Sequence, residues 1–147
     1  MQFEFSGTID RINENSLLKK MTDRQALLDA NESFYRAFEK RDLDAMSKIW
    51  SQGTASLCIH PGRQAIEGWQ QIRASWEKIF KATHYLEIDL DIVRVEVHEN
   101  FGYIVAIENL LQINGGRKLK AQSMATNLFE YLGGSWYLIH HHGSPIV

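Results

Sequence analysis

The sequence predicts an α+β fold in which N-terminal helices pack on one curved, cone-shaped antiparallel sheet, leaving a mostly apolar pocket open at one end. Two observations predict it. Apolar residues recur at helical spacing between residues 22 and 80, and they alternate with polar residues from about residue 86 onward. Helices that come first and long strands that come second favour α+β over repeated βαβ units. The 147 residues, 44% of them hydrophobic, suffice for one domain.

The helical part has recognisable start signals. Thr22, with Gln25 three residues later, has the pattern of a capping box, so the first long helix is expected to begin there. We therefore expect an N-terminal extension over residues 1–21 and a domain over residues 22–147. Asp42 is the expected N-cap of a short second helix, because its side chain can accept a hydrogen bond from the first turn.

The remaining segments are predicted to be one more helix and the strands. A short strand at residues 55–59 precedes a third helix at about residues 68–80, and the apolar period then changes to two. The apolar face of the next strand changes near Ile92 and Val93. This predicts a β-bulge, because a regular strand cannot change its buried face midway. Turns at residues 100–102, 114–116 and 133–134 separate strands at about residues 103–113, 118–132 and 136–142.

Composition and charge exclude several classes of function. The net charge is −2 and no basic stretch is present, so we expect no binding to nucleic acids. A lone cysteine, Cys58, allows no internal disulfide and fits a reducing compartment. The first residues lack the apolar run of a secretion signal, and residues 104–111 are far fewer than the roughly 20 that span a bilayer. We therefore expect a cytoplasmic protein that does not bind membranes.

The predicted sheet has two apolar faces. Ile104 and Ala106 alternate with Val105 and Ile107, so both sides of this strand carry apolar side chains. The helices can cover one face, and the other face then needs a partner. We therefore predict a homodimer formed through the sheet face.

The helices supply large side chains that could line the pocket. Such residues more often form a core than a cofactor site, but in a cone the core and the pocket wall are continuous. We expect the pocket to take a small apolar or weakly polar metabolite and no cofactor. The helical residues expected to line it are Tyr35, Met46, Trp50, Ile72 and Trp76.

Four strings carry a resemblance: residues 34–44, the corner His60-Pro61-Gly62, Gly68 before the third helix, and the ending at residues 136–145. Together they resemble the nuclear-transport-factor-2-like superfamily, and most closely its SnoaL-like branch, over residues 22–147. The ending also resembles the association domain of calcium/calmodulin-dependent kinase. The resemblance implies the cone-shaped, cystatin-like fold. It leaves the activity open, because isomerases, dehydratases, polyketide cyclases and non-catalytic assembly modules share this scaffold.

His60 is the sharpest candidate for chemistry. It ends the short strand just before Pro61, which favours an extended backbone at the rim of the sheet. A resemblance to ketosteroid isomerase implies a general base at this corner, where that enzyme has an aspartate. A histidine with its ordinary pKa of about 6.5 can also act as a base. The alternative is a histidine that only hydrogen-bonds the turn.

Asn127 lies in a mostly apolar strand, where an unpaired buried amide would cost about 1–3 kcal/mol. In ketosteroid isomerase a protonated aspartate matches this position, so the resemblance implies a donor to a developing negative charge. The second donor of that enzyme is a tyrosine, which matches Phe34 here. Tyr35 is expected to point about 100° away around the helix. The resemblance therefore leaves one of two donors missing.

Glu108 interrupts an apolar strand with a carboxylate. A buried carboxylate needs a cation, a donor or a proton, and Arg73 on the third helix is a candidate partner. The alternative is a glutamate that faces solvent or the dimer interface. In the kinase association domain an arginine matches this position, so the opposite charge here implies a ligand with an amine or a hydroxyl group.

Three consecutive histidines lie in the last strand, and alternation puts His140 and His142 on one face and His141 on the other. His140 and His142 could share a metal ion, but no further ligands occur at a recognised spacing, so no metal site is expected. The resemblance to the kinase association domain assigns the strand's two faces. It places Tyr137, Ile139 and His141 toward the pocket, and Trp136, Leu138, His140 and His142 toward the dimer side.

Two functions fit these residues. The first is a small-molecule-binding protein with a mostly apolar pocket and no chemistry. The second is a cofactor-independent isomerase, dehydratase or cyclase, with His60 as general base and Asn127 and Glu108 as polar groups in the pocket. The incomplete set of donors favours the first function.

Overall fold

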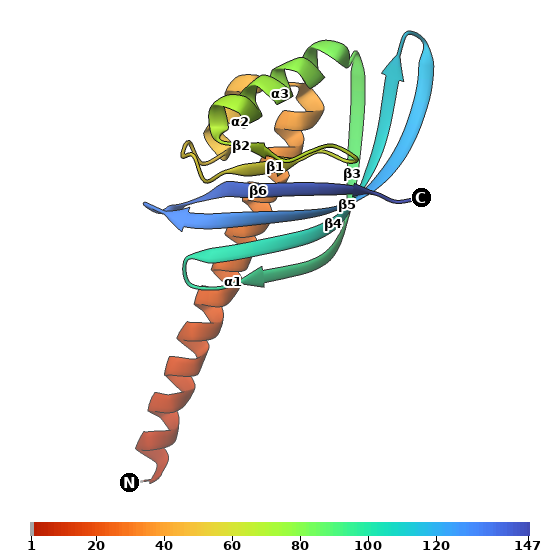
Figure 1. Ribbon diagram of the computed structural model, residues 1–147. Helices are drawn as coiled ribbons and strands as arrows, with labels where there is room; N and C mark the ends of the chain where they lie inside the picture. Colours follow the sequence, from red (N-terminus) through yellow and green to blue (C-terminus); the bar gives the residue numbers. More distant parts are fainter. Residues whose placement is uncertain (1) are drawn as a thin grey trace.

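The computed structural model describes the backbone of residues 2–147 and the side chains of residues 13–147. Helices come first and long strands second, and the helices pack on one side of a curved sheet (Figure 1). The α+β fold class expected from the sequence is therefore confirmed. The elements are α1 Gln2–Lys40, α2 Leu43–Ile49, β1 Leu57–Ile59, β2 Ile66–Glu67, α3 Trp69–Ala82, β3 Tyr85–Val97, β4 Phe101–Asn114, β5 Arg117–Leu132 and β6 Ser135–Pro145.

The six strands form one sheet in the order β2-β1-β6-β5-β4-β3. The long strands β3 to β6 form an antiparallel meander, as short turns between neighbours require. β1 pairs with β6 in parallel, so the sheet is mixed rather than purely antiparallel. This pairing places the end of β1, where His60 follows Ile59, beside the end of β6.

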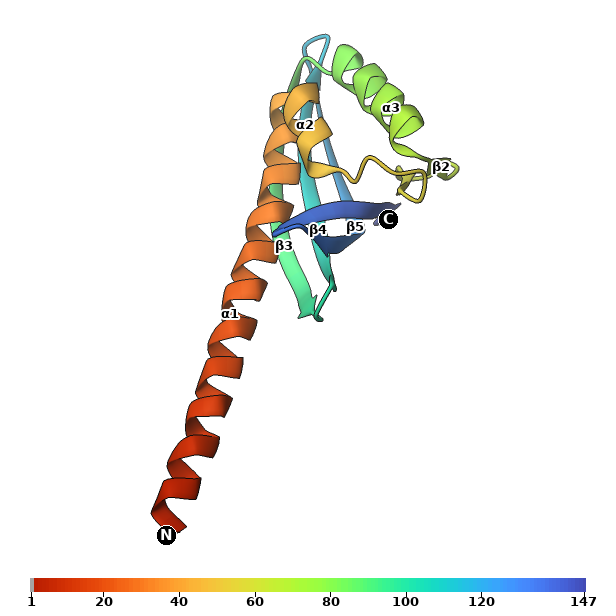
Figure 2. The same cartoon turned by 90° about the vertical axis from the view of Figure 1, so that its left-hand side faces the viewer.

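The helix α1 is longer than the sequence predicts. Thr22 is not its N-cap; the Thr22 hydroxyl donates to the carbonyl oxygen of Leu18 at 2.9 Å, inside the helix. Gln25 bonds Asp29 instead of completing a capping box. Leu17 and Leu18 are 59% and 60% exposed, and Figure 2 shows α1 running well past the sheet. The capping pattern was misleading because the chain before Thr22 is itself compatible with helix.

Two other local predictions are confirmed. The register of β3 against β4 shifts between Ile92 and Arg94, which is the bulge that the change of apolar face requires. Asp42 caps α2, and its carboxylate accepts from the backbone N–H of Ala45 at 3.0 Å. The bulge lets β3 keep apolar residues toward the helices along both of its halves.

The core lies between the helices and the concave face of the sheet. Phe34 contacts Trp50 and Trp76 edge-to-face, with ring centroids 6.2 and 5.7 Å apart. Gly102 on β4 lets α1 approach closely, because a Cβ there would lie 2.7 Å from Cδ2 of Leu27. None of the helices in the described part of the chain is long and apolar enough to cross a membrane.

Candidate functional site

A network of buried polar side chains lies inside the apolar core. It consists of Asn31 and Tyr35 on α1, Glu108 on β4, Asn127 on β5 and His141 on β6. We call these five residues the buried polar network. All five are at most 3% exposed. Polar groups at this depth cost free energy unless they are hydrogen-bonded, so their partners define what the site can do.

Sheet register brings the three strand residues together. Asn127 pairs directly with His141 across β5 and β6, and with Ile104 across β5 and β4. Glu108 lies four residues beyond Ile104 and therefore on the same face of the sheet. This face is the one covered by α1, so Asn31 and Tyr35, four residues apart on the helix, reach it from above.

In the buried polar network, each side chain from His141 onward donates a hydrogen bond to the next, and the last acceptor is Glu108. Asn127 Nδ2 donates to Asn31 Oδ1 at 2.9 Å and to the Tyr35 hydroxyl at 3.1 Å. The Tyr35 hydroxyl donates to Glu108 Oε2 at 2.6 Å. Because Asn127 uses its amide nitrogen this way, its oxygen accepts from Nδ1 of His141, at 2.6 Å. The chain of donors from His141 through Asn127 and Tyr35 therefore ends on Glu108.

Burial shifts the pKa values of the network strongly. Burial raises the pKa of Glu108 to about 7, although the hydrogen bond from Tyr35 opposes the shift by stabilising the carboxylate. Burial raises the pKa of Tyr35 well above its ordinary value, and the charge of Glu108 adds to this. Burial lowers the pKa of His141 to about 3, helped by the other histidines. Near neutral pH, Glu108 is therefore the member of this set that gains or loses a proton.

His60 lies at the rim of the same interior and is 7% exposed. Its ring contacts Trp76 edge-to-face with centroids 4.8 Å apart, and its Nε2 lies 3.1 Å from Ser75 Oγ. The Ser75 hydroxyl donates to the carbonyl oxygen of Ile72 at 2.8 Å, so His60 Nε2 must be the donor in its bond with Ser75. Burial, and secondarily the charge of Arg63, lowers the pKa of His60 to about 4, which keeps the ring neutral.

Cys58 is buried beside His60, with its Sγ 3.7 Å from His60 Nε2. Burial and the nearby charge of Glu108 raise the pKa of this thiol to about 12. A thiol that stays protonated is a poor nucleophile, so Cys58 acts as a packing residue. In the described part of the chain, no group of three or more histidine, cysteine, aspartate or glutamate side chains could hold a metal ion.

The comparisons with known proteins identify the family. The SnoaL-like domain family matches residues 27–147, most of the chain and the whole of the site just described. The chain belongs to this family. A curated relative of this SnoaL-like domain is F-box protein SKIP8 of Arabidopsis thaliana, 27% identical over 123 residues, which cover 84% of the chain and 51% of the relative. The chain thus spans about half the length of that protein.

Solved structures similar to this SnoaL-like domain confirm the fold. A candidate dehydratase of the nuclear-transport-factor-2-like family from Streptomyces avermitilis is 26% identical, with a TM-score of 0.82, covering 87% of this chain and 99% of that one. A candidate calcium/calmodulin-dependent protein kinase type II association domain from Thiobacillus denitrificans is 27% identical, with a TM-score of 0.73, covering 80% and 93%. A ketosteroid isomerase-like protein from Erwinia carotovora, at 17% identity with a TM-score of 0.75 and coverages of 85% and 97%, shares the fold.

The structure corrects one prediction about partners in this SnoaL-like domain. Phe34 and Tyr35 are neighbours on α1 and are both fully buried. The hydroxyl of Tyr35 donates to Glu108 Oε2. Arg73 is not the partner of Glu108, since it lies on the exposed side of α3 and pairs with Glu77 at 3.5 Å.

The prediction for the faces of β6 is partly wrong. His141 does point into the interior, but Tyr137 and Ile139 are only half-buried, whereas Trp136 and Leu138 join the core. The cause is a second bulge: Leu128 pairs with His140 and Phe129 with Leu138, so Ile139 has no partner residue on β5. Before the bulge the even-numbered residues of β6 face the interior, and after it the odd-numbered residues do. The bulge near Ile92 has the same effect in β3.

The residues predicted to line a pocket are packed together in the SnoaL-like core. Met46, Trp50, Ile72 and Trp76 are all fully buried beside Tyr35 and His141. The indole Nε1 atoms of Trp50 and Trp76 have no hydrogen-bond partner among the described residues. Sequence reasoning missed Asn31, although its place four residues after Leu27, on the face of α1 that Leu27 buries, was a usable signal. Whether a ligand enters here stays a prediction.

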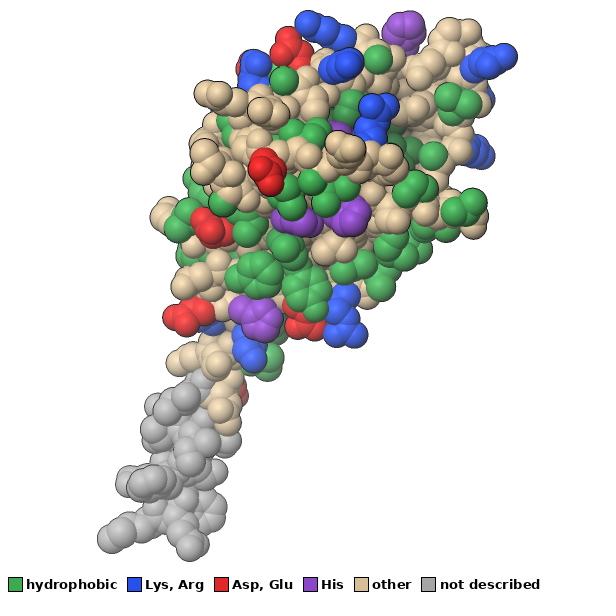
Figure 3. Space-filling model, viewed as in Figure 1, with side chains coloured by type: hydrophobic (Ala, Val, Ile, Leu, Met, Phe, Trp, Pro, Cys, Tyr) green, Lys and Arg blue, Asp and Glu red, His purple; other side chains and the backbone are tan. Residues whose placement is uncertain are grey.

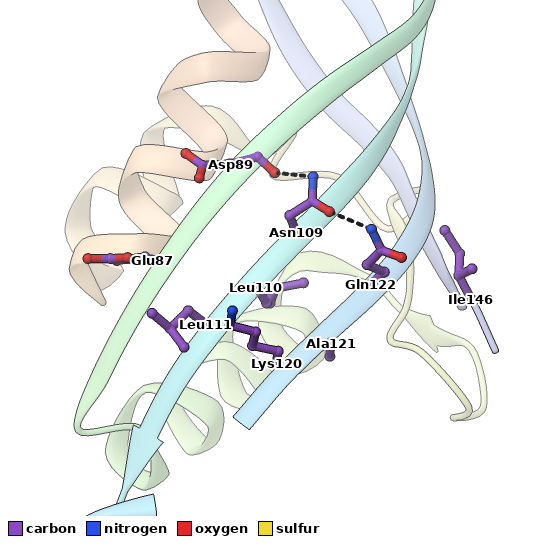
Figure 4. Close-up of a pocket in the computed structure, with 9 residues that line it drawn as sticks. All are labelled: Glu87, Asp89, Asn109, Leu110, Leu111, Lys120, Ala121, Gln122 and Ile146. Carbon is purple, nitrogen blue, oxygen red and sulfur yellow. Dashed lines mark hydrogen bonds between the residues drawn. The ribbon is translucent and has the colours of Figure 1, made fainter. Parts of the chain in front are cut away.

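A surface cavity of about 670 Å³ lies elsewhere. Its side chains Glu87, Asp89, Asn109 and Gln122 alternate out of phase with the buried residues of the same strands, so it lies on the face that the helices leave uncovered. Figure 4 shows Asp89, Asn109 and Gln122 side by side on β3, β4 and β5, with Gln122 Nε2 donating to Asn109 Oδ1 at 2.7 Å. Asn109 Nδ2 donates to the backbone carbonyl oxygen of Asp89 at 3.4 Å.

Proposed function

We propose that this SnoaL-like domain binds a small, largely apolar molecule in its interior, with the buried polar network and Trp76 contacting the molecule's polar group. The observation that supports this most directly is the indole N–H of Trp76, which is fully buried and has no acceptor among the described residues. A buried donor without a partner costs about 1–3 kcal/mol, so a ligand oxygen at that N–H would stabilise the domain. His141 and His60 flank the same indole, with ring centroids 6.2 and 4.8 Å away.

The chemistry of the interior sets the class of ligand. The walls are aromatic and aliphatic, which suits a small apolar body, and we keep Tyr35, Met46, Trp50, Ile72, Trp76 and His141 as the proposed lining. Glu108 supplies an acceptor and Trp76 a donor. A hydroxyl group can satisfy both, because it donates and accepts. The proposed ligand is thus an apolar molecule with a hydroxyl, and no cofactor is needed to hold it.

The fluorescent phenol 2-naphthol is a suitable probe for this proposal. We expect it to bind the purified protein more tightly than naphthalene does, and Trp76→Phe to weaken its binding by roughly tenfold, the effect of about 1.4 kcal/mol. Trp136→Phe is the matched control, because the buried indole N–H of Trp136 also has no partner among the described residues. Trp136 lies at the start of β6 and packs against Tyr131 on β5, away from the proposed site. Fluorescence titration measures all three proteins. Equal affinities for naphthol and naphthalene would contradict the proposal.

A second candidate function is cofactor-independent proton transfer by an isomerase, dehydratase or cyclase, with His60 as the base and Asn127 and Glu108 as polar groups. It is favoured by one observation: the pKa of Glu108 is raised to about 7, near the pH at which an acid–base catalyst works best. His60 fits the role of base less well, since its Nε2 proton is directed at Ser75.

The proposed partner, beside the ligand, is a second copy of the chain bound through the uncovered sheet face. Figure 3 shows hydrophobic side chains gathered over the strands on this face, with histidines among them. Val105 and Ile107 on β4 are half-buried here, and Met124 on β5 is 36% exposed. We expect light scattering at micromolar concentration to give the mass of a dimer, and Ile107→Lys to give a monomer. A monomeric wild-type chain would exclude this partner.

We also propose that the protein is cytoplasmic, because its lone cysteine stays reduced in that compartment.

A further inference from the structure

His140 and His142 lie on the side of β6 opposite to the buried polar network. His141 between them is buried and binds Asn127, so strand alternation turns its two neighbours toward the uncovered face of the sheet. The rings of His140 and His142 contact each other, with centroids 6.4 Å apart. Figure 3 shows histidine side chains amid hydrophobic ones on this face. One chain thus offers two imidazoles side by side at a surface that the helices leave uncovered.

Sheet register places these histidines in two neighbouring rows of outward-facing residues. Each row crosses the strands β1, β6, β5, β4 and β3, with one residue from each strand. The His140 row is Leu57, His140, Leu128, Tyr103 and Glu96, and the His142 row is Ile59, His142, Thr126, Val105 and Arg94. Between the rows, each strand has one residue that packs in the core: Cys58, His141, Asn127, Ile104 and Val95. The two rows therefore face outward together.

The two rows are complementary to each other. In a two-fold symmetric contact the same patch of both copies meets, so an axis between the rows places the His140 row of one copy opposite the His142 row of the second. Glu96 then faces Arg94, with which it already pairs within one chain at 2.9 Å, so unlike charges alternate across the contact. The apolar residues of the two rows also face one another. This self-complementarity indicates a second copy of the chain as the partner of this face.

We propose that the two copies share one Zn²⁺ ion, bound by His140 and His142 of both chains. The inference rests on the proposed homodimer. Four imidazole nitrogens match the tetrahedral coordination of a structural zinc site, in which each Zn–N distance is about 2.0–2.1 Å. Residues two apart in a strand lie roughly 6.7 Å apart, and rotation about χ1 and χ2 can bring both ring nitrogens to one ion.

The two-fold axis supplies the ligands that a single chain lacks. The described part of one chain has no group of three or more metal-binding side chains, but a pair of histidines on each copy makes four. The ion also satisfies the imidazole nitrogens, which would otherwise cost free energy in a contact that excludes water. Zinc therefore stabilises the dimer and takes no part in binding a ligand in the interior.

Zinc chloride added to the purified full chain tests the shared site. Sedimentation velocity should show the dissociation constant of the dimer fall by at least about tenfold with zinc, because the ion binds the dimer and not the monomer, and EDTA should reverse the change. Calorimetric titration should give one zinc ion for two chains. Magnesium chloride should have no effect, since Mg²⁺ prefers oxygen ligands.

His142→Asn removes one imidazole from each half of the site. It should abolish the effect of zinc on the dimer and leave the urea unfolding of the metal-free chain unchanged, because His142 is exposed. His84→Asn is the matched control: His84 is also exposed but lies between α3 and β3, outside both rows. Cobalt(II), a spectroscopic substitute for zinc, should give the intense visible absorption of a tetrahedral site with the wild type and His84→Asn, but not with His142→Asn.

The outcomes separate the zinc site from the proposed homodimer. A dimer that forms but neither binds zinc nor tightens with it overturns the metal site and leaves the homodimer standing. One zinc ion per chain, or a wild-type response in His142→Asn, shows that the ion is not shared between the histidine pairs of two copies. A chain that stays monomeric with and without zinc overturns both.

Discussion

Lowering the pH from 7.5 to 4.5 is expected to destabilise the wild-type protein by about 3 kcal/mol more than it destabilises the His141→Asn variant. The folded protein holds His141 neutral, because burial lowers its pKa to about 3, whereas the unfolded chain protonates it below about 6.5. The stabilisation is therefore complete above about pH 6.5 and is lost as the pH falls toward 3. Asparagine keeps a donor near the position of Nδ1 but does not titrate.

Urea unfolding at the two pH values measures this difference. The same replacement at His84, whose side chain is exposed, is the control for exchanging a histidine for an asparagine outside the core. Glu108 acts in the opposite sense, since its raised pKa favours the folded state at low pH, but it is present in both proteins and cancels. A wild type and a His141→Asn variant with the same pH dependence would show that His141 is not held neutral by folding.

Replacing Asn127 with leucine is expected to lower the free energy of unfolding by about 4 kcal/mol. Asn127 joins Asn31, Tyr35 and His141, so leucine leaves a buried amide oxygen and a buried imidazole N–H without partners. Leucine is similar in size, so the loss reports hydrogen bonding rather than a cavity. Urea unfolding at pH 7.5 gives the value.

Asn109→Leu is the matched control for this prediction. Asn109 lies on the neighbouring strand β4, and its hydrogen bonds to Asp91 and Gln122 are at the surface, where water can replace them. We expect its cost to be below about 1 kcal/mol, in the range of exposed substitutions. Equal losses for the two leucine variants would show that burial of the network does not matter to stability.

Much of the fold could be predicted because its signals are local. The bulge at Ile92 follows from the change of apolar face within one strand, and the cap at Asp42 from a single side chain at a helix start. The bulge at Ile139 was missed because the apolar residues of β6 give no comparable change of face. The capping-box pattern at Thr22 and Gln25 can occur at the start of a helix or inside one. The sequence pattern alone therefore could not locate the first residue of α1.

The site could be predicted in its residues but not in its contacts. Glu108 and Asn127 stand out as polar residues in apolar strands, which identifies them without any structure. Their partners depend on sheet register and on the rotation of α1, and neither is encoded in a short stretch of sequence. Tyr35 was therefore not recognised as the donor to Glu108, and Arg73 was expected in its place.

The place of β6 between β1 and β5 has a consequence for the order in which the chain folds. β1 has its long-range partner in β6, through pairs such as Leu57 with His140, so it stays without that neighbour until β6 has been made. The meander of β3, β4 and β5 can form earlier from adjacent segments. During synthesis, the corner at His60 is thus assembled last, and Glu108 meets its surroundings only when the final strand has closed the sheet.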